Sequence, residues 1–373
     1  MKKAVIVIPT YNEAANIEKL IKTIFGVSSN LKDWSISCVV VDSTSPDGTS
    51  RLVEKLQRAY DELFLLKTGK EGLGKAYVNG FKYALEKFEP DVLFEMDADL
   101  SHDPKKILEF LKQIDRGADF VVGSRYIKGG SIPKNWAFHR KLFSVLGNLI
   151  IRIGFMKPKI TDWTSGYRAI KADIVKDSLS YIEKFSGYVF QVALLDFALK
   201  KNATISQVPI HFTDRVHGKS KINSIQFIIQ TLFYVFFKSS FIKYGLVGLG
   251  GATIDFGISY IIIEIIKISP NRYWLATLIS AEFAIAFNFT ANNFWSFAHK
   301  KLEHKSSVFL KSFLKFNLIA AGALAIQAVG IQFFTNILGP SYWYIYKILI
   351  LALIVIPYSY ILYNKIIWKS KKS

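Results

Sequence analysis

The C-terminal third of this chain contains uncharged stretches long enough to cross a bilayer. No Asp, Glu, Lys, Arg or His occurs from Phe316 to Tyr346, and a second such run extends from Ile348 to Asn364. A membrane-spanning helix needs about 20 mostly apolar residues, so both runs predict membrane helices. Two earlier stretches have the same length and hydropathy, each interrupted by one central acid. The sequence thus predicts four spans within residues 241–373, at about 244–266, 273–297, 316–337 and 344–366.

The distribution of lysines predicts how these spans are oriented. The formal net charge is +19, and lysines gather in the loop between the second and third spans and in the C-terminal tail. The loop after the first span carries only Lys267 and Arg272. By the positive-inside rule, both termini and the soluble part are expected in the cytoplasm, in an integral protein of the plasma membrane. Basic residues at that surface also favour anionic membrane lipid. A nucleic-acid partner is not expected, because neither a basic groove with aromatic residues nor a reading helix is present.

Asp255 and Glu282 lie near the middle of the first two spans. An ionisable group at that depth is energetically costly and is a functional candidate by default. A protonated acid that hydrogen-bonds to Asn288, Asn292 or Asn293 would instead hold the helices together. Both interpretations stay open at the level of sequence.

The first 220 residues alternate between strand and helix patterns. This alternation predicts an α/β fold, a mostly parallel sheet between helices. A helical spacing of apolar residues over 222–238 predicts a helix in the membrane interface. The expected domains are therefore 1–221, catalytic; 222–240, interfacial linker; and 241–373, transmembrane. The expected strands are Ala4–Ile8, Ile36–Val41, Leu63–Lys67, Val92–Met96, Phe120–Gly123 and one near Ile205–His211, and the expected helices include Ala14–Phe25, Thr49–Tyr60, Lys75–Lys87, Pro104–Arg116, Phe138–Ile153 and Tyr188–Lys201.

Acidic residues follow several of the expected strands. Asp97-Ala98-Asp99 comes directly after the apolar run that ends at Met96, and Asp42 ends the second strand. Two carboxylates one residue apart suit a hard divalent cation that keeps positions open for phosphate oxygens. Taken alone, such a triplet is also common in solvated turns. Ligands of parallel sheets bind beyond the carboxyl ends of the strands, so one nucleotide-sugar site can collect these loops together with residues 9–13.

Four cations are predicted to surround phosphates in that site: Arg125, Arg140, Arg215 and Lys221. An Arg fork binds phosphate oxygens with two hydrogen bonds, although a surface ion pair is an ordinary role for each residue alone. Residues 69–76 spell G-x-x-x-x-G-K, but Ala76 replaces the hydroxyl residue that binds magnesium in phosphate loops. A glycine-rich turn before a helix is therefore predicted. His102 is interpreted as part of a helix entry, and Cys38, the one cysteine, as a buried thiol.

These motifs together resemble the dolichyl-phosphate or polyprenyl-phosphate mannose synthases, family 2 glycosyltransferases with the GT-A (Rossmann-like) fold. The resemblance covers about the first 225 residues. The four-span remainder resembles the GtrA-like membrane domain of some prokaryotic members, on hydropathy and on residues 292–297. The motifs that carry it are Ile8–Glu13, Ser45–Thr49, Gly72-Leu73-Gly74, Met96–Pro104, Gly123–Tyr126 and Gly218–Lys221.

The resemblance implies a role for each matching residue. The lipid phosphate would be received by Arg125, Arg140 and Ser144, and Arg215 and Lys221 would close over the donor. Mg²⁺ or Mn²⁺ would be bound by Asp97 and Asp99, with Ser101 where some relatives have a further ligand. Ser43 stands where relatives usually have a second acid, which leaves the base contact open. The nucleotide-sugar contacts implied are Pro9, Tyr11, Glu13, Val41, Asp42, Asp97, Ala98 and Asp99.

The expected activity is an inverting transfer of mannose from GDP-mannose to a membrane dolichyl or polyprenyl phosphate. A phosphate monoester has a second pKa of about 6, so the acceptor needs no general base near neutral pH. Two alternatives remain: a UDP-sugar donor with the same acceptor, and a non-catalytic carrier of lipid-linked sugar. A processive polysaccharide synthase is disfavoured, because the Gln-x-x-Arg-Trp motif of such enzymes is absent.

Overall fold

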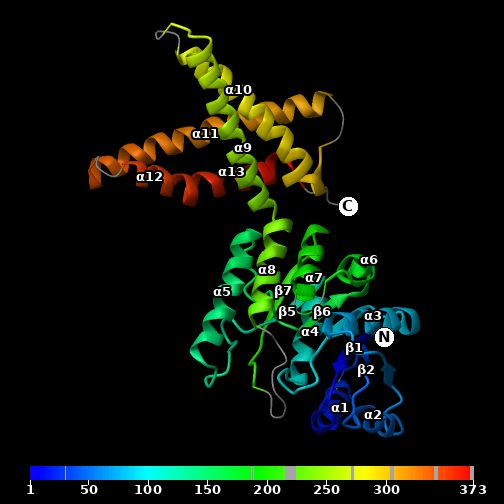
Figure 1. The fold of residues 1–373 in the computed structure, drawn as a ribbon. Helices are drawn as coiled ribbons and strands as arrows, with labels where there is room; N and C mark the ends of the chain where they lie inside the picture. Colours follow the sequence, from blue (N-terminus) through cyan, green and yellow to red (C-terminus); the bar gives the residue numbers. More distant parts are fainter. Residues whose placement is uncertain are drawn as a thin grey trace. The chain divides into compact units, whose positions relative to one another are not determined.

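The structure is a computed structural model that describes residues 1–29, 31–185, 187, 189–214, 224–269, 273–302, 306–339 and 343–369. The chain divides into two compact units, Met1–Val235 and Phe236–Ser373. Figure 1 shows the ribbon with its labelled elements. The predicted domain boundary near residue 221 lies outside the described residues, as do Arg215 and Lys221.

The first unit is built on a mixed sheet whose described strands number seven, in the order β3-β2-β1-β4-β6-β5-β7. β6 is antiparallel to both of its neighbours, and the remaining neighbours are parallel. The predicted strands are confirmed, and the carboxyl ends of β1, β2, β4 and β5 share one edge. The strands are β1 (Lys2–Thr10), β2 (Trp34–Asp42), β3 (Leu63–Lys67), β4 (Val92–Glu95), β5 (Phe120–Ser124), β6 (Arg168–Lys171) and β7 (Ile205–Pro209).

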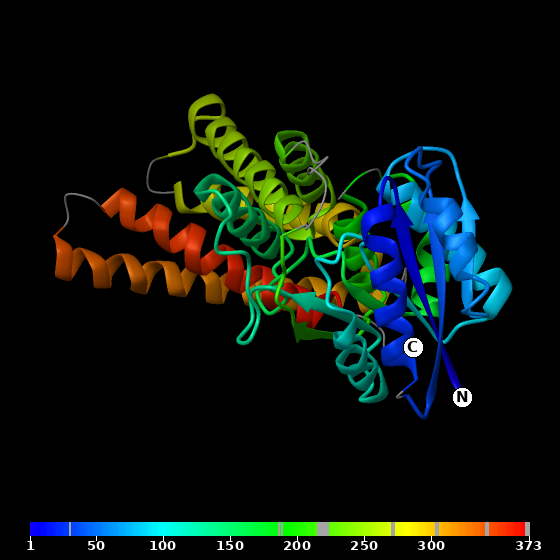
Figure 2. The ribbon, with the colours of Figure 1, turned by 90° about the horizontal axis from the view of Figure 1, so that it is seen from below.

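Helices cover both faces of this sheet (Figures 1 and 2). Alternate residues of β1 point to opposite faces, so Ile6 and Ile8 join the core with α1 and α4. On the other face Gly80 of α3 lies against Val7 and Val41, where a methyl group would clash. The helices are α1 (Ala14–Ser28), α2 (Thr49–Leu56), α3 (Leu73–Phe88), the short η1 (Pro104–Lys106), α4 (Ile107–Asp115), α6 (Ala172–Ile182) and α7 (Val189–Lys200).

Two elements were not predicted from the sequence. The segment 161–168 was interpreted as a loop, yet its last residue, Arg168, begins strand β6, and helix α6 follows at once. β6 has only four residues and starts with a charged one, so it lacks the apolar signature of a buried strand. Cys38, by contrast, is buried in the core as predicted, and burial raises the pKa of its thiol.

Two further helices, α5 (Phe138–Gly154) and α8 (Ser224–Lys238), run side by side in Figure 1. They pack so closely that a methyl group on Gly154 would collide with Val235. The outer side of α5 carries a row of exposed apolar side chains, which a water-soluble domain normally buries. That row consists of Phe138, Leu142, Phe143, Val145, Leu146, Leu149, Ile150 and Ile153, between 41 and 79% exposed.

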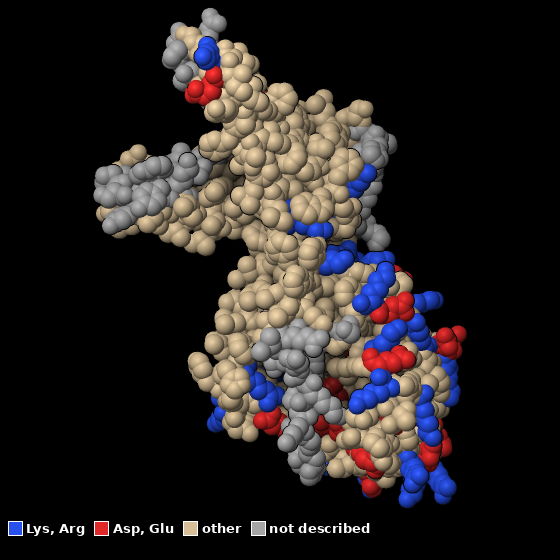
Figure 3. All heavy atoms as spheres, in the orientation of Figure 1, with Lys and Arg blue, Asp and Glu red and all other residues tan. Residues whose placement is uncertain are grey.

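The second unit is helical and nearly free of charge on the face seen in Figure 3. Two of its helical segments, Ser240–Ile265 and Ile348–Ile367, are long and apolar enough to span a membrane, and the predicted count of four is not confirmed among the described residues. Its elements are α9 (Ser240–Tyr260), η2 (Ile261–Ile265), α10 (Tyr273–Ala291), η4 (Asn292–Ser296), η5 (Ala298–Lys300), α11 (Ser306–Leu338), α12 (Trp343–Ile350), η7 (Leu351–Val355), α13 (Ile356–Leu362) and η8 (Tyr363–Ile367).

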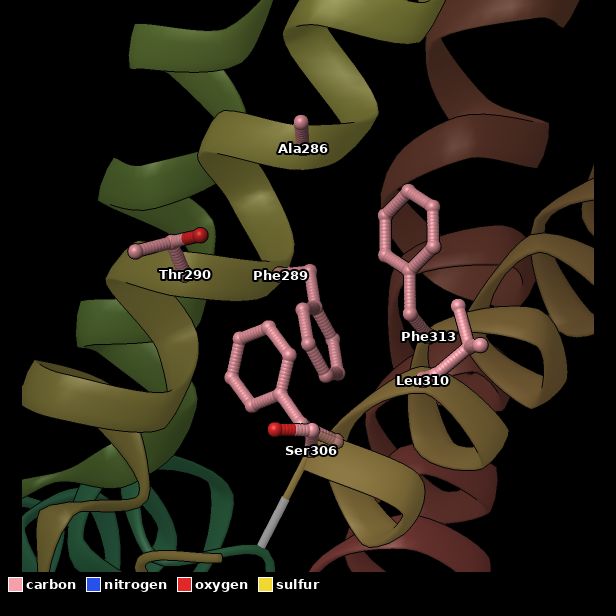
Figure 4. A pocket seen from close by; sticks show the side chains of 7 residues that line it. Ala286, Phe289, Thr290, Ser306, Leu310 and Phe313 are labelled. Atoms are coloured by element: carbon pink, nitrogen blue, oxygen red, sulfur yellow. The ribbon is translucent and has the colours of Figure 1, made fainter. Parts of the chain in front are cut away.

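Polar side chains link the helices of this unit. The Ser280 hydroxyl donates to Asp255 across 2.5 Å, and Asn293 Oδ1 accepts from the indole of Trp368 at 3.0 Å. The ammonium of Lys300 donates to Asn364 Oδ1 at 3.0 Å. A cavity of about 470 Å³ opens between α10 and α11, and Figure 4 shows Phe289 and Phe313 facing it from the two helices.

Candidate active site

The loop after β4 carries the predicted metal-binding acids. Asp97 is half-buried, and its backbone N–H donates to Nδ1 of His102 at 3.1 Å. Because Nδ1 accepts, the ring proton lies on Nε2, which is 4.0 Å from an Asp97 carboxylate oxygen. The His102 ring is 2% exposed and stacks on Tyr167. His102 therefore supports the Asp97 loop from within the core, a contact that the sequence did not reveal.

The remaining groups of this loop fit a divalent cation. Asp99 is 3% exposed, and one of its oxygens accepts from the N–H of Ser101 at 3.1 Å. The hydroxyl of Ser101 is buried and has no hydrogen-bond partner among the described residues. Two carboxylates with a nearby unpaired hydroxyl are an oxygen donor set of the kind that Mg²⁺ or Mn²⁺ accepts, with phosphate oxygens completing the shell. In the described parts of the chain, no group of three or more acids, histidines or cysteines is placed so that these residues alone could hold a metal ion.

The loops after β1 and β2 form the neighbouring side of the site. Tyr11 is half-buried, and the ammonium of Lys70 lies 4.0 Å from the centre of its ring. Glu13 accepts from the Asn16 amide at 2.8 Å at the start of α1. Pro9 is half-buried, whereas Val41 and Ala98 lie in the core. Contacts of these residues with a nucleotide remain predictions.

Asp42 is completely buried at the end of β2. Its carboxylate accepts from the hydroxyls of Thr10, Ser45 and Ser50 and from the N–H of Ser45, at 2.5–3.0 Å. In this arrangement Asp42 shapes the loop after β2 from inside. Its direct contact with a nucleotide was predicted from the sequence and stays a prediction.

Each of these three loops contains a residue other than glycine with a positive φ. The angles are 61° at Asn12, 55° at Thr44 and 63° at Leu100. Side chains with a Cβ rarely adopt this region, and such residues persist only where surrounding contacts enforce them, commonly at ligand sites. Three of the seven such residues in the described chain therefore lie at the sheet edge that carries the acids.

Arg125 follows β5 and is held by one carboxylate. Its Nε and Nη2 donate to the two oxygens of Asp162 at 2.7 Å each, and its backbone N–H donates to the same group at 3.1 Å. Nη2 also donates to Thr164 at 2.9 Å. Because Asp162 is fully buried and the Arg125 side chain is 9% exposed, the guanidinium is fixed in direction. No sequence motif indicated that Asp162 would orient this cation.

The other predicted acceptor residues lie on the first turns of α5. The hydroxyl of Ser144 is 2.6 Å from that of Tyr126, the residue after Arg125. Arg140 stacks over the Trp136 ring at 3.9 Å and pairs with Asp214 at 3.3 Å. The structure therefore brings Ser144 beside the Arg125 segment, and Arg140 beside Trp136, which precedes α5, and Asp214, which follows β7.

Phe212, which follows β7, connects the two sides. Its ring centre lies 5.9 Å from the His102 ring, 5.6 Å from the Arg125 guanidinium carbon and 5.8 Å from the Trp136 ring. The acid loop after β4, the cation after β5 and the start of α5 thus meet around one aromatic residue. No sequence motif indicated Phe212, since it lies after a short strand in a polar stretch.

A buried ion pair lies behind the acid loop. Glu95 and Arg168 are both fully buried, with 3.7 Å between Arg168 Nε and a Glu95 oxygen. Burial raises the pKa of Glu95 to about 7, and the positive charge of Arg168 opposes that shift. Burial likewise lowers the pKa of Arg168. Neither residue was predicted to matter.

Comparison with known proteins agrees with this architecture. Residues 5–179 match the glycosyl transferase family 2 model, and residues 243–368 match the GtrA/DPMS transmembrane domain model. The α/β sheet and the membrane domain thus define a membrane-bound glycosyltransferase.

Two relatives indicate which kind of glycosyltransferase this is. The dolichol-phosphate mannosyltransferase of Pyrococcus furiosus is 30% identical over 336 residues, which cover 88% of this chain and 89% of that protein. The polyprenol monophosphomannose synthase of Mycolicibacterium smegmatis is 36% identical over 60% of this chain and 82% of its own length. The glucosyl-3-phosphoglycerate synthase structure from Mycobacterium tuberculosis, at 18% identity, has a TM-score of 0.45 over 63% of this chain and 79% of that one. The chain belongs to the family 2 glycosyltransferases of the dolichyl- and polyprenyl-phosphate mannose synthase type, with a GtrA-like transmembrane domain.

Proposed function

We propose that the protein transfers mannose from GDP-mannose to a membrane polyprenyl or dolichyl phosphate, with inversion at the anomeric carbon and with Mg²⁺ or Mn²⁺ bound. The names of the two relatives support the sugar and the acceptor. The observation that carries the proposal is the meeting of the Asp97–Asp99 loop and the Asp162-held Arg125 around Phe212. The acid loop suits a cation that binds a nucleotide diphosphate, and Arg125 suits a second phosphate.

The donor would lie along the loops after β1, β2 and β4. Asp97 and Asp99, with the unpaired hydroxyl of Ser101, would hold the cation, which neutralises the departing diphosphate when bound. The half-buried Tyr11, with Lys70 above it, offers a platform and a positive charge on the same side. Arg215 and Lys221 are proposed, from the sequence alone, to complete the donor site.

The acceptor phosphate would meet Arg125, Arg140 and Ser144. An oxygen of that phosphate forms the new bond to the anomeric carbon, and the bond from that carbon to the diphosphate breaks, so that GDP leaves with the electron pair. The acceptor oxygen is already deprotonated near pH 7, so no side chain has to remove a proton. Arg125 is held in one direction by Asp162, and this orientation reduces the entropy of aligning two anions that repel each other.

The exposed apolar row on α5 supports a lipid acceptor. It begins beside Arg140 and Ser144, so a membrane surface that covered the row would bring lipid phosphates to these residues. Tethering by the transmembrane domain would confine enzyme and acceptor to the same surface and raise their effective concentration. We propose that the catalytic unit and both termini lie on the cytoplasmic side.

The test is sugar transfer by the full chain purified in detergent, with polyprenyl phosphate as acceptor. GDP-mannose, UDP-glucose and a mixture of GDP- and UDP-sugars are supplied, and the lipid products are identified by mass spectrometry. We expect polyprenyl-phosphate mannose from GDP-mannose, with loss of activity in EDTA and recovery on adding Mn²⁺ or Mg²⁺. If hexose is transferred only from the UDP-sugar, the donor is a UDP-sugar and not GDP-mannose. If nothing is transferred from any donor, the protein is not a sugar transferase.

A further inference from the structure

The Glu95–Arg168 pair lies beside the site, yet the mechanism above does not use it. Glu95 on β4 and Arg168 on β6 face each other in register, and both side chains are fully buried. Neither carboxylate oxygen of Glu95 nor the Nε of Arg168 has a hydrogen bond of good geometry among the described residues, although the Gln191 side chain lies near enough to lower the pKa of Glu95. Two charges desolvated this way gain little net stability, and an apolar pair of similar size would often serve folding as well. Fold stability alone therefore does not account for the pair.

The other nitrogens of Arg168 show what the pair holds. Nη2 donates to the carbonyl of Trp163 at 2.8 Å, and Nη1 donates to the carbonyl of Gln191 in the first turn of α7 at 2.7 Å. The N–H of Trp163 donates in turn to the buried Asn148 of α5 at 2.7 Å. The guanidinium thus fixes the backbone at Trp163, next to Asp162, from the interior of the protein.

The position of Arg168 in the sheet makes this contact a link between the two sides of the site. β6 lies between β4 and β5, and Arg168 is opposite Glu95 on one strand and Val122 on the other. β4 runs into the acid loop two residues beyond Glu95, and β5 runs into Arg125. A shift of Arg168 would therefore change how the cation and the acids are spaced.

We propose that Arg168 is a positioning residue: anchored on Glu95 beside the acid loop, it holds the Trp163 backbone so that Asp162 aims Arg125 at the acceptor phosphate. The inference rests on the function proposed above. It predicts that a substitution that breaks this link raises the KM for the acceptor and changes the affinity for the donor much less.

The first test replaces Arg168 by Lys, which keeps a positive charge opposite Glu95 but cannot donate to two carbonyls at once. With the full chain in detergent, we expect the acceptor KM of Arg168→Lys to rise by at least about tenfold, the loss that follows removal of a hydrogen bond to a charged group. The dissociation constant of GDP with Mn²⁺ should change less than about twofold. Lys171→Met is the matched control, since Lys171 lies on the same strand in a partly exposed pair with Asp119. This control should leave both constants unchanged.

The second test is a double-mutant cycle with Asp162→Asn. If Arg168 acts through Asp162, the double variant Arg168→Lys with Asp162→Asn should have nearly the acceptor KM of Asp162→Asn alone. Effects that multiply would show that the two residues act separately and would overturn the proposal. A purely structural role for Arg168 would lower the melting temperature and the active fraction while leaving the KM of the folded enzyme unchanged, and that result would also overturn it.

A neutral pair, Glu95→Gln with Arg168→Gln, guards against unfolding, because it leaves no single charge buried. We expect the same increase in acceptor KM, since Gln cannot span both carbonyls. An unchanged KM in this variant would count against the proposal. Absence of transfer by the unmodified protein would instead contradict the proposed function itself, so the two failures are distinguishable.

Discussion

The two units treat buried polar groups in different ways. In the first unit several of the buried groups next to the site carry charge and form ion pairs, as in Arg125–Asp162 and Arg168–Glu95. In the second unit the polar side chains less than 5% exposed are all uncharged among the described residues. They are Ser239, Ser280, Asn292, Asn293, Ser296 and Ser359.

This difference follows from the solvent that each unit meets. A charge at the edge of a sheet in an aqueous domain can be oriented by a buried partner and still attract phosphate. Inside a bilayer an unpaired charge is costly, whereas amides and hydroxyls can join helices without one. We infer that the chemistry resides in the first unit and that the polar groups of the second hold its helices together. The following variants test that contrast, beginning with the largest expected effect.

Replacing Asp99 by Ala should affect turnover most. The change removes a buried carboxylate beside Ser101 that we propose as a metal ligand, so the cation that would neutralise the leaving group should be lost. We expect turnover to fall about hundredfold to thousandfold, the range for loss of a key electrostatic group. The measurement is mannose transfer over a titration of Mn²⁺, with Mn²⁺ binding followed separately by electron paramagnetic resonance. Asp177→Asn, in an exposed pair with Lys201, is the control and should behave as the unmodified protein. Normal Mn²⁺ binding by Asp99→Ala would place the metal elsewhere.

Replacing Arg125 by Lys should have the next largest effect. The charge remains, but Lys cannot contact both oxygens of Asp162, so the cation loses its fixed direction. We expect the acceptor KM to rise about tenfold, with the GDP dissociation constant nearly unchanged. Arg116→Lys, at the C-terminal end of α4, serves as control. An equal loss of donor binding would show that Arg125 belongs to the donor side instead.

In the second unit the largest expected effect is on stability. Asn293 Oδ1 accepts from both the Leu302 N–H and the Trp368 indole, each at 3.0 Å. Asn293→Ala would leave both donors unpaired, which costs about 1–3 kcal/mol per buried group. We expect a lower melting temperature in detergent with GDP binding intact, whereas Asn336→Ala, at an exposed position of α11, should change neither. Loss of GDP binding in Asn293→Ala would contradict the division of roles between the units.

A smaller effect is expected at Asp47, near the start of α2. Partial burial raises the pKa of Asp47, but hydrogen bonds from the Thr49 hydroxyl and from the N–H groups of Ala14 and Thr49 outweigh it and hold the pKa below its ordinary value. A group with a lowered pKa stabilises the fold above its unfolded pKa, and this stabilisation is lost as the pH falls through the folded pKa. Asp47→Asn should therefore be slightly less stable than the unmodified protein at pH 7. Unfolding curves should converge below about pH 3; a gap that is independent of pH would exclude the charge as its cause.

The sequence predicted the parts of the fold that are long or periodic. The apolar strands β1, β2 and β4 and the acids that follow them were recognisable, because a buried parallel strand is a continuous apolar run. β6 was not, since its four residues begin with a charge. Within the sheet its first residue pairs with Glu95, 73 positions earlier along the chain (168 − 95). Such a pairing is a tertiary fact with no local signal.

The sequence predicted which residues belong to the site, but not which side chains hold them in place. Motifs indicated the Asp97 loop and Arg125, whereas nothing in the sequence connected Arg125 to Asp162 or His102 to the Asp97 backbone. Phe212 was missed for the same reason. Which side chain orients another depends on how the folded chain packs. Many residue types can occupy such positions, so the sequence pattern does not identify them.

The last variant tests the two interpretations of the acid in the first membrane segment. Asp255 accepts from Ser280 of α10, and Ser280 accepts from Ser259, one turn further along α9. If this network only joins the helices, Asp255→Asn keeps an acceptor for Ser280, and transfer and melting temperature should change little. Asp255→Leu should lower the melting temperature while leaving the transfer rate per folded molecule the same. A lipid-linked sugar carrier would need the ionisable group itself. Reduced movement of mannosyl lipid across proteoliposomes by Asp255→Asn, with normal transfer, would therefore favour that activity for the second unit.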